Sequence, residues 1–292
     1  MPKMITMDMM TTKRPSTATT LSLAQEPVKK TLKETDDQIK SRLRERFQVL
    51  EDMTRAVKKG QVRAMIVSGP PGVGKSFGVE AVLSKHDTMA NIAGNEKLKK
   101  YEVVKGAMSA LGLYKKLFEF SGSKNILVFD DCDSVLLDDL SLNILKAALD
   151  SSKKRMIHWN TESHALNRDG IPDSFEFKGG AIFITNIKFD NVKSRKLRDH
   201  LEALESRCHY LDLTIDTERE KILRIRQIIE DGMLDVYEFG DEGRESVINF
   251  IDENKTSLRE LSLRMVLKIA DLRASFPDRW ENVAKMTCMR RS

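Results

Sequence analysis

The chain has 292 residues, of which 40% are hydrophobic and 32% charged, and it carries a formal net charge of +5. This length suits one or two domains. A mean hydropathy of -0.39, with no apolar run near the ~18 residues of a membrane span, argues against a membrane protein. Three cysteines far apart in the sequence argue against a disulfide framework or a zinc site. The first residues lack the apolar core of a secretory signal, so we expect a cytoplasmic protein with no membrane partner.

The first 35 residues are predicted to form a disordered tail. Residues 1–35 contain three prolines, a Ser/Thr-rich run and no sustained hydrophobic period. Ordering such a segment would bury little apolar surface to offset the loss of chain entropy. From Asp36 onward, apolar residues recur at spacings of three and four until Gly60. This pattern predicts an amphipathic helix that leads into the next domain.

Short β-branched runs alternate with helical segments between residues 62 and 215. Two of the runs are continuously apolar, as expected for strands that helices cover on both faces. The alternation predicts an α/β fold, in which a parallel sheet is the middle of three layers, over a domain of residues 36–215. The predicted strands are 62–68, 101–105, 125–130, 181–185 and 209–215, and the predicted helices between them are 75–85, 108–120, 140–150 and 195–205.

Two regions depart from this alternation. Between residues 152 and 179, two short β-prone pieces predict a hairpin inserted into the sheet domain. After residue 215 no strand pattern recurs, and segments such as 258–274 have helical spacing. The sequence therefore predicts a smaller α-helical domain over residues 216–292.

A phosphate-binding motif follows the first predicted strand. Residues 69–76 read GPPGVGKS and match G-x-x-x-x-G-K-[ST]. Glycines let the backbone wrap a triphosphate with its N–H groups pointing inward, and the next helix adds the N–H groups of its first turn. Lys75 is expected to reach the β- and γ-phosphates, and Ser76 to offer its hydroxyl to Mg²⁺. The predicted nucleotide-binding residues are Gly69, Pro70, Pro71, Gly72, Val73, Gly74, Lys75 and Ser76.

A second predicted strand ends in acidic residues. Residues 125–131 read NILVFDD, and a metal-assisted phosphoryl site needs carboxylates of this kind near the phosphates. We predict that Asp130 binds Mg²⁺ together with Ser76 and that Asp131 polarises the attacking water. The alternative is an ordinary cluster of surface acids at the end of a strand.

The segments GPPGVGKS, ILVFDD and IFITN together resemble the AAA+ ATPases, and the resemblance covers about residues 36–274. It implies the strand order 5-1-4-3-2, an α-helical lid, bound ATP with Mg²⁺ and a ring-shaped homo-oligomer. It also implies that Asn186 senses the γ-phosphate, although an asparagine after a strand can simply form a turn. Most members of the family have Glu where Asp131 stands, so this chain would hold the water differently.

Two arginines are implied by the same resemblance. Ser206-Arg207-Cys208 resembles the arginine finger of clamp-loader subunits, which acts on a nucleotide bound by a neighbouring subunit. The alternative is that Arg207 bonds the last carbonyls of its own helix. Residues 256–261 resemble a sensor-2 stretch at the start of a lid helix, which implies that Arg259 contacts the γ-phosphate. Arg264, further along the same predicted helix, is the alternative, and a solvated arginine paired with an acid is another. The predicted catalytic residues are Lys75, Asp131, Asn186, Arg207 and Arg259.

The sequence thus predicts an ATPase that uses ATP to remodel or load a macromolecular partner. A basic pI near 8.9, the clamp-loader-like motif and the inserted hairpin favour DNA or a nucleoprotein complex as that partner. The alternative for the hairpin is that its apolar residues pack on the core while its lysines are solvated. The hairpin residues with suitable charge or stacking surface are Lys153, Lys154, Arg155, His158 and Trp159.

Two other functions remain open at this point. A protein remodeller is one, although residues 106–112 lack the aromatic residue that a threading pore loop usually carries. A nucleotide-regulated scaffold with little hydrolysis is the other, because Asp131 departs from the family pattern. The overall pattern also looks like compact ATPases of bacteriophages, which would place the protein in the host cytoplasm.

Overall fold

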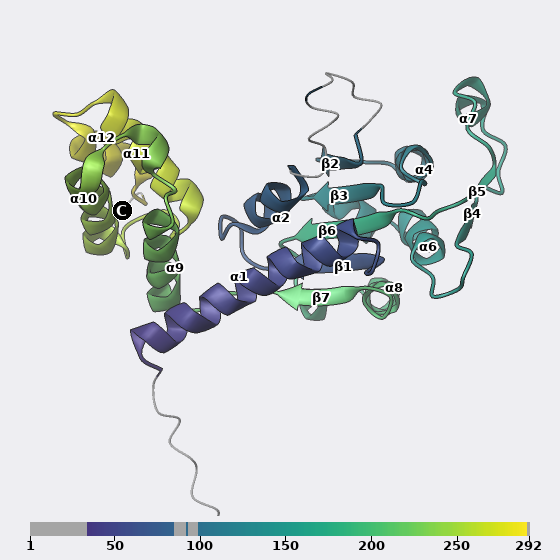
Figure 1. Ribbon diagram of the computed structural model, residues 1–292, viewed down its shortest axis with the longest axis horizontal. Helices are drawn as coiled ribbons and strands as arrows, with labels where there is room; N and C mark the ends of the chain where they lie inside the picture. Colours follow the sequence, from purple (N-terminus) through teal and green to yellow (C-terminus); the bar gives the residue numbers. More distant parts are fainter. Residues whose placement is uncertain (1–33, 85–91, 93–98, 291–292) are drawn as a thin grey trace, which may run out of the picture. The chain divides into compact units, whose positions relative to one another are not determined.

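A parallel five-stranded sheet lies at the centre of the N-terminal part of the fold. The computed structural model describes residues 34–84, 92 and 99–290, so the predicted tail of residues 1–35 lies almost wholly outside the described residues. The strands run in the order β2-β3-β6-β1-β7 (Figure 1). Numbered along the chain as five strands, this order is 5-1-4-3-2, as the sequence analysis expected. The strands are β1 (Ala64–Ser68), β2 (Tyr101–Lys105), β3 (Ile126–Asp130), β6 (Gly180–Thr185) and β7 (His209–Asp212).

Helices cover both faces of this sheet, because its inner strands are apolar on both sides. Every residue of β1, β3 and β6 is buried. On one face, Met65 and Val67 pack with α1 and α2, while on the other Ile66 packs with α4, α6 and α8. These contacts make the three layers that the continuous apolar runs predicted. The helices are α1 (Asp36–Lys58), α2 (Lys75–Leu83), α4 (Ala110–Glu119), α5 (Asp133–Leu137), α6 (Asp139–Ala148) and α8 (Arg195–Glu205).

The last strand is shorter than its sequence pattern. The sequence predicted a strand over residues 209–215, but β7 ends at Asp212. The side chain of Asp212 accepts a hydrogen bond from the backbone N–H of Thr214 at 2.7 Å, which turns the chain out of the sheet. The apolar residues after Asp212 are still buried in the core. The hydrophobic run in the sequence is therefore longer than the strand, and this is why the predicted strand was too long.

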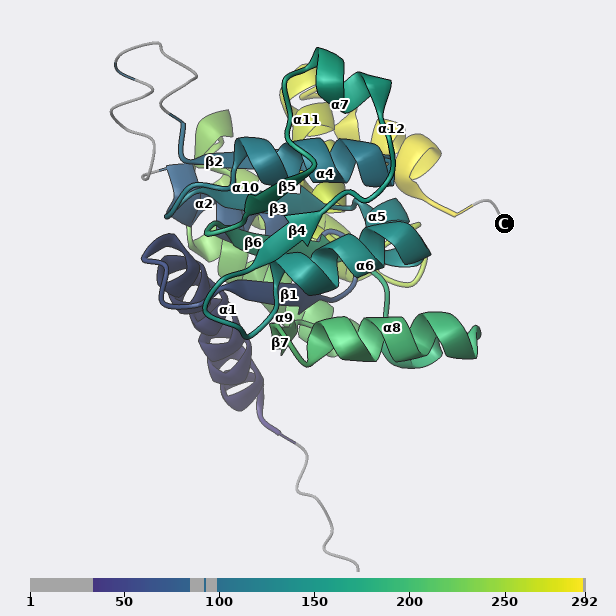
Figure 2. The same cartoon turned by 90° about the vertical axis from the view of Figure 1, so that its right-hand side faces the viewer.

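Residues 152–179, where the sequence predicts a hairpin, contain two antiparallel strands. These strands, β4 (Met156–His158) and β5 (Ser174–Glu176), lie side by side in both views, with α7 (His164–Arg168) between them along the chain (Figures 1 and 2). The ring of Trp159 lies 5.5 Å from that of Tyr114. Arg155 is buried and donates hydrogen bonds to the carbonyls of Ala148 and Gly179. Arg155 therefore holds the hairpin to the core, which corrects its assignment to a client-facing surface.

The C-terminal part of the chain is helical and has its own apolar core. Its helices are α9 (Glu218–Glu230), α10 (Gly240–Asn254), α11 (Leu263–Ser275) and α12 (Trp280–Cys288). The sequence predicted helix from residue 258, but α11 begins later because Ser262 caps it. Leu258, before the cap, instead forms an isolated antiparallel bridge with Met289. None of the helices in the described ranges combines the length and the apolar character needed to cross a bilayer.

Candidate nucleotide site

The candidate site is assembled where three neighbouring strands end. β1 ends at Ser68 opposite Thr185 of β6, and β3 ends at Asp130 opposite Ile184 of β6. The residues that follow these parallel strands therefore meet at the carboxyl edge of the sheet, where open α/β sheets bind ligands. They are the phosphate loop (residues 69–76), Asp131 and Asn186.

Glycines shape the phosphate loop as the sequence analysis expected of a triphosphate cradle. Gly72 has φ +73°, and a Cβ there would lie 2.6 Å from the Cβ of Ser262. Gly74 has φ +100° and caps α2 without a side-chain hydrogen bond, so the first N–H groups of α2 keep no side-chain partner at the cap. A helix start of this kind, reached by a loop without side chains, fits a bound phosphate group.

Lys75 is buried beneath the loop. Its Nζ donates hydrogen bonds to the carbonyls of Gly69 at 2.7 Å and Pro70 at 2.8 Å, and to Oδ1 of Asn186 at 2.8 Å. Burial lowers the pKa of Lys75 to about 8, although the carboxylates of Asp131 and Asp130 act in the opposite direction. The ammonium is thus charged at neutral pH and lies close to the loop that would hold the phosphates.

Ser76, the last residue of the loop, lies beside Asp130. The Ser76 hydroxyl donates to Oδ1 of Asp130 at 2.8 Å, and the Asp130 side chain is only 7% exposed. One hydroxyl and one carboxylate suit Mg²⁺, which takes few protein ligands and completes its shell with water and phosphate oxygens. The oxygen donors and the glycine cradle therefore fit a triphosphate with Mg²⁺.

Lys105 is a part of the site that the sequence analysis missed. Its Nζ lies 3.3 Å from Oδ2 of Asp130 and 3.0 Å from Oε1 of Glu80 in α2. Lys105 ends β2 and is paired in register with Asp130, so it also lies at the carboxyl edge. The sequence could have indicated Lys105, because it is the last residue of the predicted strand YEVVK and the resemblance places that strand beside the one that ends in acidic residues.

Asp131 and Asn186 are joined directly. Nδ2 of Asn186 donates to Oδ1 of Asp131 at 2.9 Å, while Oδ1 of Asn186 accepts from Lys75. Asp131 has φ +53°, in the left-handed region that Asp and Asn tolerate better than other residues with a side chain. This backbone conformation gives a physical reason for a short aspartate at a position where the longer glutamate would be strained.

Comparisons with known proteins agree with this arrangement. A model of the family "ATPase family associated with various cellular activities (AAA)" matches residues 65–197. A protein of Enterobacteria phage T4, described as "Uncharacterized 36.7 kDa protein in nrdC-mobD intergenic region", is 35% identical over 256 residues. The match covers 87% of this chain and 76% of the phage protein. The chain belongs to the AAA ATPase family.

In this AAA ATPase, Arg207 lies at the other edge of the sheet from the phosphate loop. It follows α8 and precedes β7, whose first residue His209 pairs with Met65 near the start of β1. Its Nη1 donates to the carbonyl of Ala203 in its own helix, and its buried Nε has no partner among the described residues. Arg207 thus makes the contact with its own helix that the sequence analysis gave as the alternative to an arginine finger. The structure does not bring Arg207 to the loop of its own chain.

The two candidate sensor arginines of the AAA ATPase are separated, which corrects their assignment to one helix. Arg259 lies before α11, and its Nε donates to the carbonyl of Met289 at 2.9 Å. Arg264 lies in the first turn of α11, where its Cγ would be 3.7 Å from a Cβ placed on Gly72. Burial of Lys75 is the main cause of its lowered pKa, and the positive charge of Arg264 lowers that pKa further. The residue near the loop is therefore Arg264, while Arg259 is engaged by the C-terminal segment.

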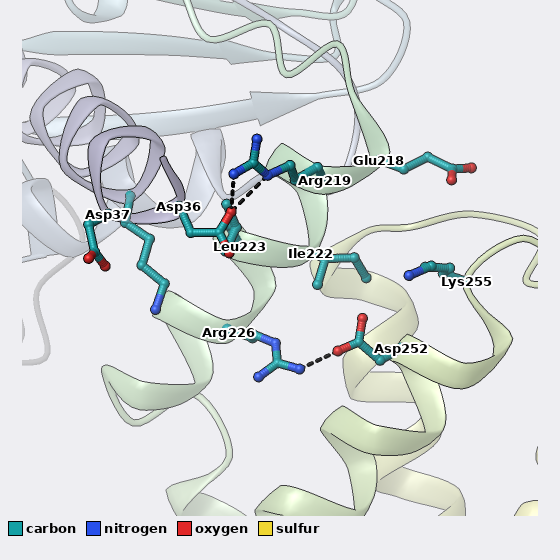
Figure 3. A pocket seen from close by; sticks show the side chains of 10 residues that line it. Asp36, Asp37, Glu218, Arg219, Ile222, Leu223, Arg226, Asp252 and Lys255 are labelled. Carbon is teal, nitrogen blue, oxygen red and sulfur yellow. Dashed lines mark hydrogen bonds and ion pairs between the residues drawn. The ribbon is translucent and has the colours of Figure 1, made fainter. Parts of the chain in front are cut away.

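A pocket outside the AAA ATPase motifs is lined by residues of the helices. It has a volume of about 830 Å³ and is lined by residues of α1, α9 and α10 (Figure 3). Arg219 pairs there with Asp36, and Arg226 with Asp252. The acidic and basic side chains that line this pocket are equal in number, so their formal charges cancel, and none of the residues of the phosphate loop lines it.

Proposed function

We propose that the chain is an ATPase that binds ATP with Mg²⁺ and hydrolyses it to remodel or load a nucleic acid or nucleoprotein partner. The observation that carries the proposal is the continuous set of contacts from Lys75 through Asn186 to Asp131, beside the Ser76–Asp130 pair. Family membership supports the same activity.

Each side chain of the site has a separate role in the proposed phosphoryl transfer. Lys75 supplies positive charge to the phosphates, and the loop N–H groups hold their oxygens. Asp131 accepts a hydrogen bond from the attacking water and orients it, while Asn186 fixes the Asp131 carboxylate in place. Bound through Ser76 and Asp130, Mg²⁺ would neutralise charge on the phosphate oxygens.

We propose further that the active form is a homo-oligomer. Arg207 cannot act at the loop of its own chain, because the length of β1 separates the two positions. An arginine supplied by a second copy is an established way to complete a phosphoryl-transfer site. Its buried Nε has no hydrogen-bond partner among the described residues, so the hydrogen bonds of the guanidinium are incomplete within one copy.

The inserted hairpin supports a polyanionic client through its exposed charges. Lys153, Lys154 and His158 are exposed within the first part of the insertion. Arg155 and Trp159 are used in packing, so the contribution of the hairpin is charge and not base stacking. Contacts of lysine with phosphates carry little sequence information, which favours a client bound without strong sequence preference.

The test is the ATPase rate with single-stranded DNA, duplex DNA or an unfolded protein, at two salt concentrations. We expect DNA to stimulate turnover and the stimulation to fade at the higher salt. Replacing Lys153 and Lys154 together by Ala should remove the stimulation, while Lys285→Ala, at an exposed position of α12, should not. Stimulation by unfolded protein alone would identify a protein remodeller instead.

A second candidate is a nucleotide-regulated scaffold that hydrolyses ATP slowly. The observation that favours it is Asp131, whose short side chain is already held by Asn186. A rate that stays low with every client, together with tight ATP binding, would select the scaffold over the motor.

A further inference from the structure

A lysine lies between two carboxylates beside the phosphate loop. Lys105 is the last residue of β2, and its Nζ lies 3.3 Å from Oδ2 of Asp130 and 3.0 Å from Oε1 of Glu80. The side chain of Lys105 is 59% exposed, whereas that of Asp130 is 7% exposed. Lys105 therefore reaches from the solvent to a buried carboxylate.

Both oxygens of the Asp130 carboxylate have a partner. The hydroxyl of Ser76 donates to Oδ1 at 2.8 Å, and the ammonium of Lys105 pairs with Oδ2. Glu80 follows Ser76 by four residues in α2, so the two side chains lie on the same face of that helix. The second anchor of Lys105 thus comes from the helix that also supplies Ser76.

The buried charge of Asp130 needs a positive charge close to it. Taking a carboxylate out of water costs free energy unless an opposite charge and hydrogen bonds compensate for the lost hydration. Lys75 feels the charge of Asp130, but it donates its hydrogen bonds to two carbonyls of the loop and to Asn186. It is Lys105 whose ammonium lies within ion-pair distance of the carboxylate.

A magnesium ion at Asp130 would change this balance. Mg²⁺ carries two positive charges and binds to carboxylate oxygens. Two cations at one carboxylate repel each other, and the repulsion is stronger where little water surrounds them. Lys105 can leave Asp130 at a small cost, because its ammonium already pairs with Glu80 and its stem is exposed.

We propose that Lys105 is a built-in counter-ion of Asp130, which gives up this carboxylate to Mg²⁺ and is then held by Glu80. The inference rests on the proposed function, because it takes Asp130 to hold Mg²⁺. Lys105 thereby sets how strongly nucleotide binding depends on the metal. While it pairs with Asp130, the carboxylate repels metal-free nucleotide less. When it moves to Glu80, Asp130 is free to hold the metal.

The experiment measures the dissociation constant of ATP by calorimetry, once with EDTA and once with Mg²⁺. The ratio of the two constants reports how much the metal strengthens binding. The full chain is compared as the original, as Lys105→Met, as Glu80→Gln and as the double variant. Thermal unfolding without ligand checks that each variant folds.

Lys116→Met is the matched control. Lys116 of α4 also lies between two carboxylates, at 2.9 Å from Glu102 and 2.8 Å from Glu119. Glu102 is near the start of β2, whereas Lys105 ends that strand. The control therefore removes a lysine with the same kind of partners at the other end of the strand.

We expect Lys105→Met to raise the ratio about tenfold. Metal-free ATP should bind more weakly, because the charge of Asp130 is no longer balanced, and ATP with Mg²⁺ should bind more tightly, because a repelling cation is gone. Glu80→Gln should lower the ratio about threefold, because Lys105 is then left with Asp130 alone. The double variant should match Lys105→Met within about twofold, since Glu80 acts through Lys105. Lys116→Met should leave the ratio as it is in the original chain.

An unchanged or lowered ratio in Lys105→Met would overturn the inference while leaving the ATP site in place. So would an effect of Glu80→Gln that is equally large when Lys105 is absent, because Glu80 would then act on the metal directly. If the original chain binds ATP neither with EDTA nor with Mg²⁺, the proposed function itself fails.

Discussion

The two edges of the parallel sheet carry different kinds of site. At the carboxyl edge, Lys75, Asn186 and Asp131 are joined by side-chain hydrogen bonds. At the amino edge, Arg63 and Arg207 line a pocket of about 320 Å³, and each donates to a backbone carbonyl, with no such network between them. One edge is built to hold a ligand, whereas the other presents arginines whose donors are only partly used.

The parallel topology explains this difference. Every residue that follows a strand lies at one edge, and every residue that precedes a strand lies at the other. A strand of five residues separates the two edges by about 16 Å. In the proposed homo-oligomer, the phosphate loop and Arg207 of one copy would belong to two different active sites. The comparison shows that the phosphate loop and Arg207 lie at opposite edges of the sheet, and on the proposed function each is one half of a site.

The largest effect is expected at the carboxyl edge from Lys75→Met. The variant removes the ammonium that lies between the loop carbonyls and Asn186. We expect ATP affinity to fall about a hundredfold or more, since a buried charge pair with phosphate is lost. Calorimetry measures this, with the exposed Lys188→Met after β6 as control. Retained ATP binding in Lys75→Met would break the assignment of this edge.

Variants of Asp131 test whether the carboxyl edge takes part in ATP hydrolysis or only binds ATP. Asp131→Asn keeps the left-handed backbone and the bond from Asn186 but removes the negative charge. Turnover should fall about a hundredfold or more, with ATP affinity changed less than twofold. Asp131→Glu should instead lower stability by about 1 kcal/mol, because glutamate tolerates φ +53° poorly. Steady-state turnover and thermal unfolding measure the two effects, and equal turnover in Asp131→Asn would reject the catalytic role.

A smaller effect is expected where α11 meets the loop. Arg264 lies beside Gly72, while Arg259 is bonded to the C-terminal segment. Arg264→Ala should weaken ATP binding about tenfold, whereas Arg259→Ala should change it less than about twofold. Fluorescence titration of both variants with ATP measures these affinities and shows which of the two arginines belongs to the carboxyl-edge site. The reverse order of effects would restore Arg259 as the sensor.

An effect on stability and not on ATP binding or turnover is expected outside both edges, where α1 contacts α9. Burial alone would raise the pKa of Glu220, but hydrogen bonds from Arg42 and Thr217 hold it at about 2. A carboxylate with a lowered pKa stabilises the fold above its ordinary pKa and loses that contribution as the pH falls toward about 2. Glu220→Gln should cost about 1–2 kcal/mol at neutral pH.

The control for Glu220→Gln is the pH dependence of the difference in unfolding free energy between the variant and the original chain. Denaturant unfolding at pH 7 and at steps below pH 4.5 should show the difference between Glu220→Gln and the original chain shrinking as the solution becomes more acidic. A difference that stays constant from pH 7 to pH 2.5 would show that the charge of Glu220 does not contribute to stability.

The sequence predicted the sheet and the loop because each depends on local patterns. Continuous apolar runs placed β3 and β6, and the strand order followed from the AAA+ resemblance. Side-chain partners depend instead on which elements pack together, and no local pattern records that. Lys105 meets Asp130 only because β2 lies beside β3, and Arg224 meets Phe47 only because α9 packs on α1. The start of α11 was missed because an apolar helical spacing continued through the cap Ser262.

The most direct test of the two half-sites mixes two inactive variants. Lys75→Met has no working phosphate loop but keeps Arg207, and Arg207→Ala has the loop but lacks the arginine. Each alone should bind its partners as the original chain does yet show almost no ATP turnover. An equal mixture should recover about a quarter of the original turnover, since that share of interfaces joins an intact loop to an intact Arg207. No recovery at any mixing ratio, in mixtures shown to assemble, would contradict the account.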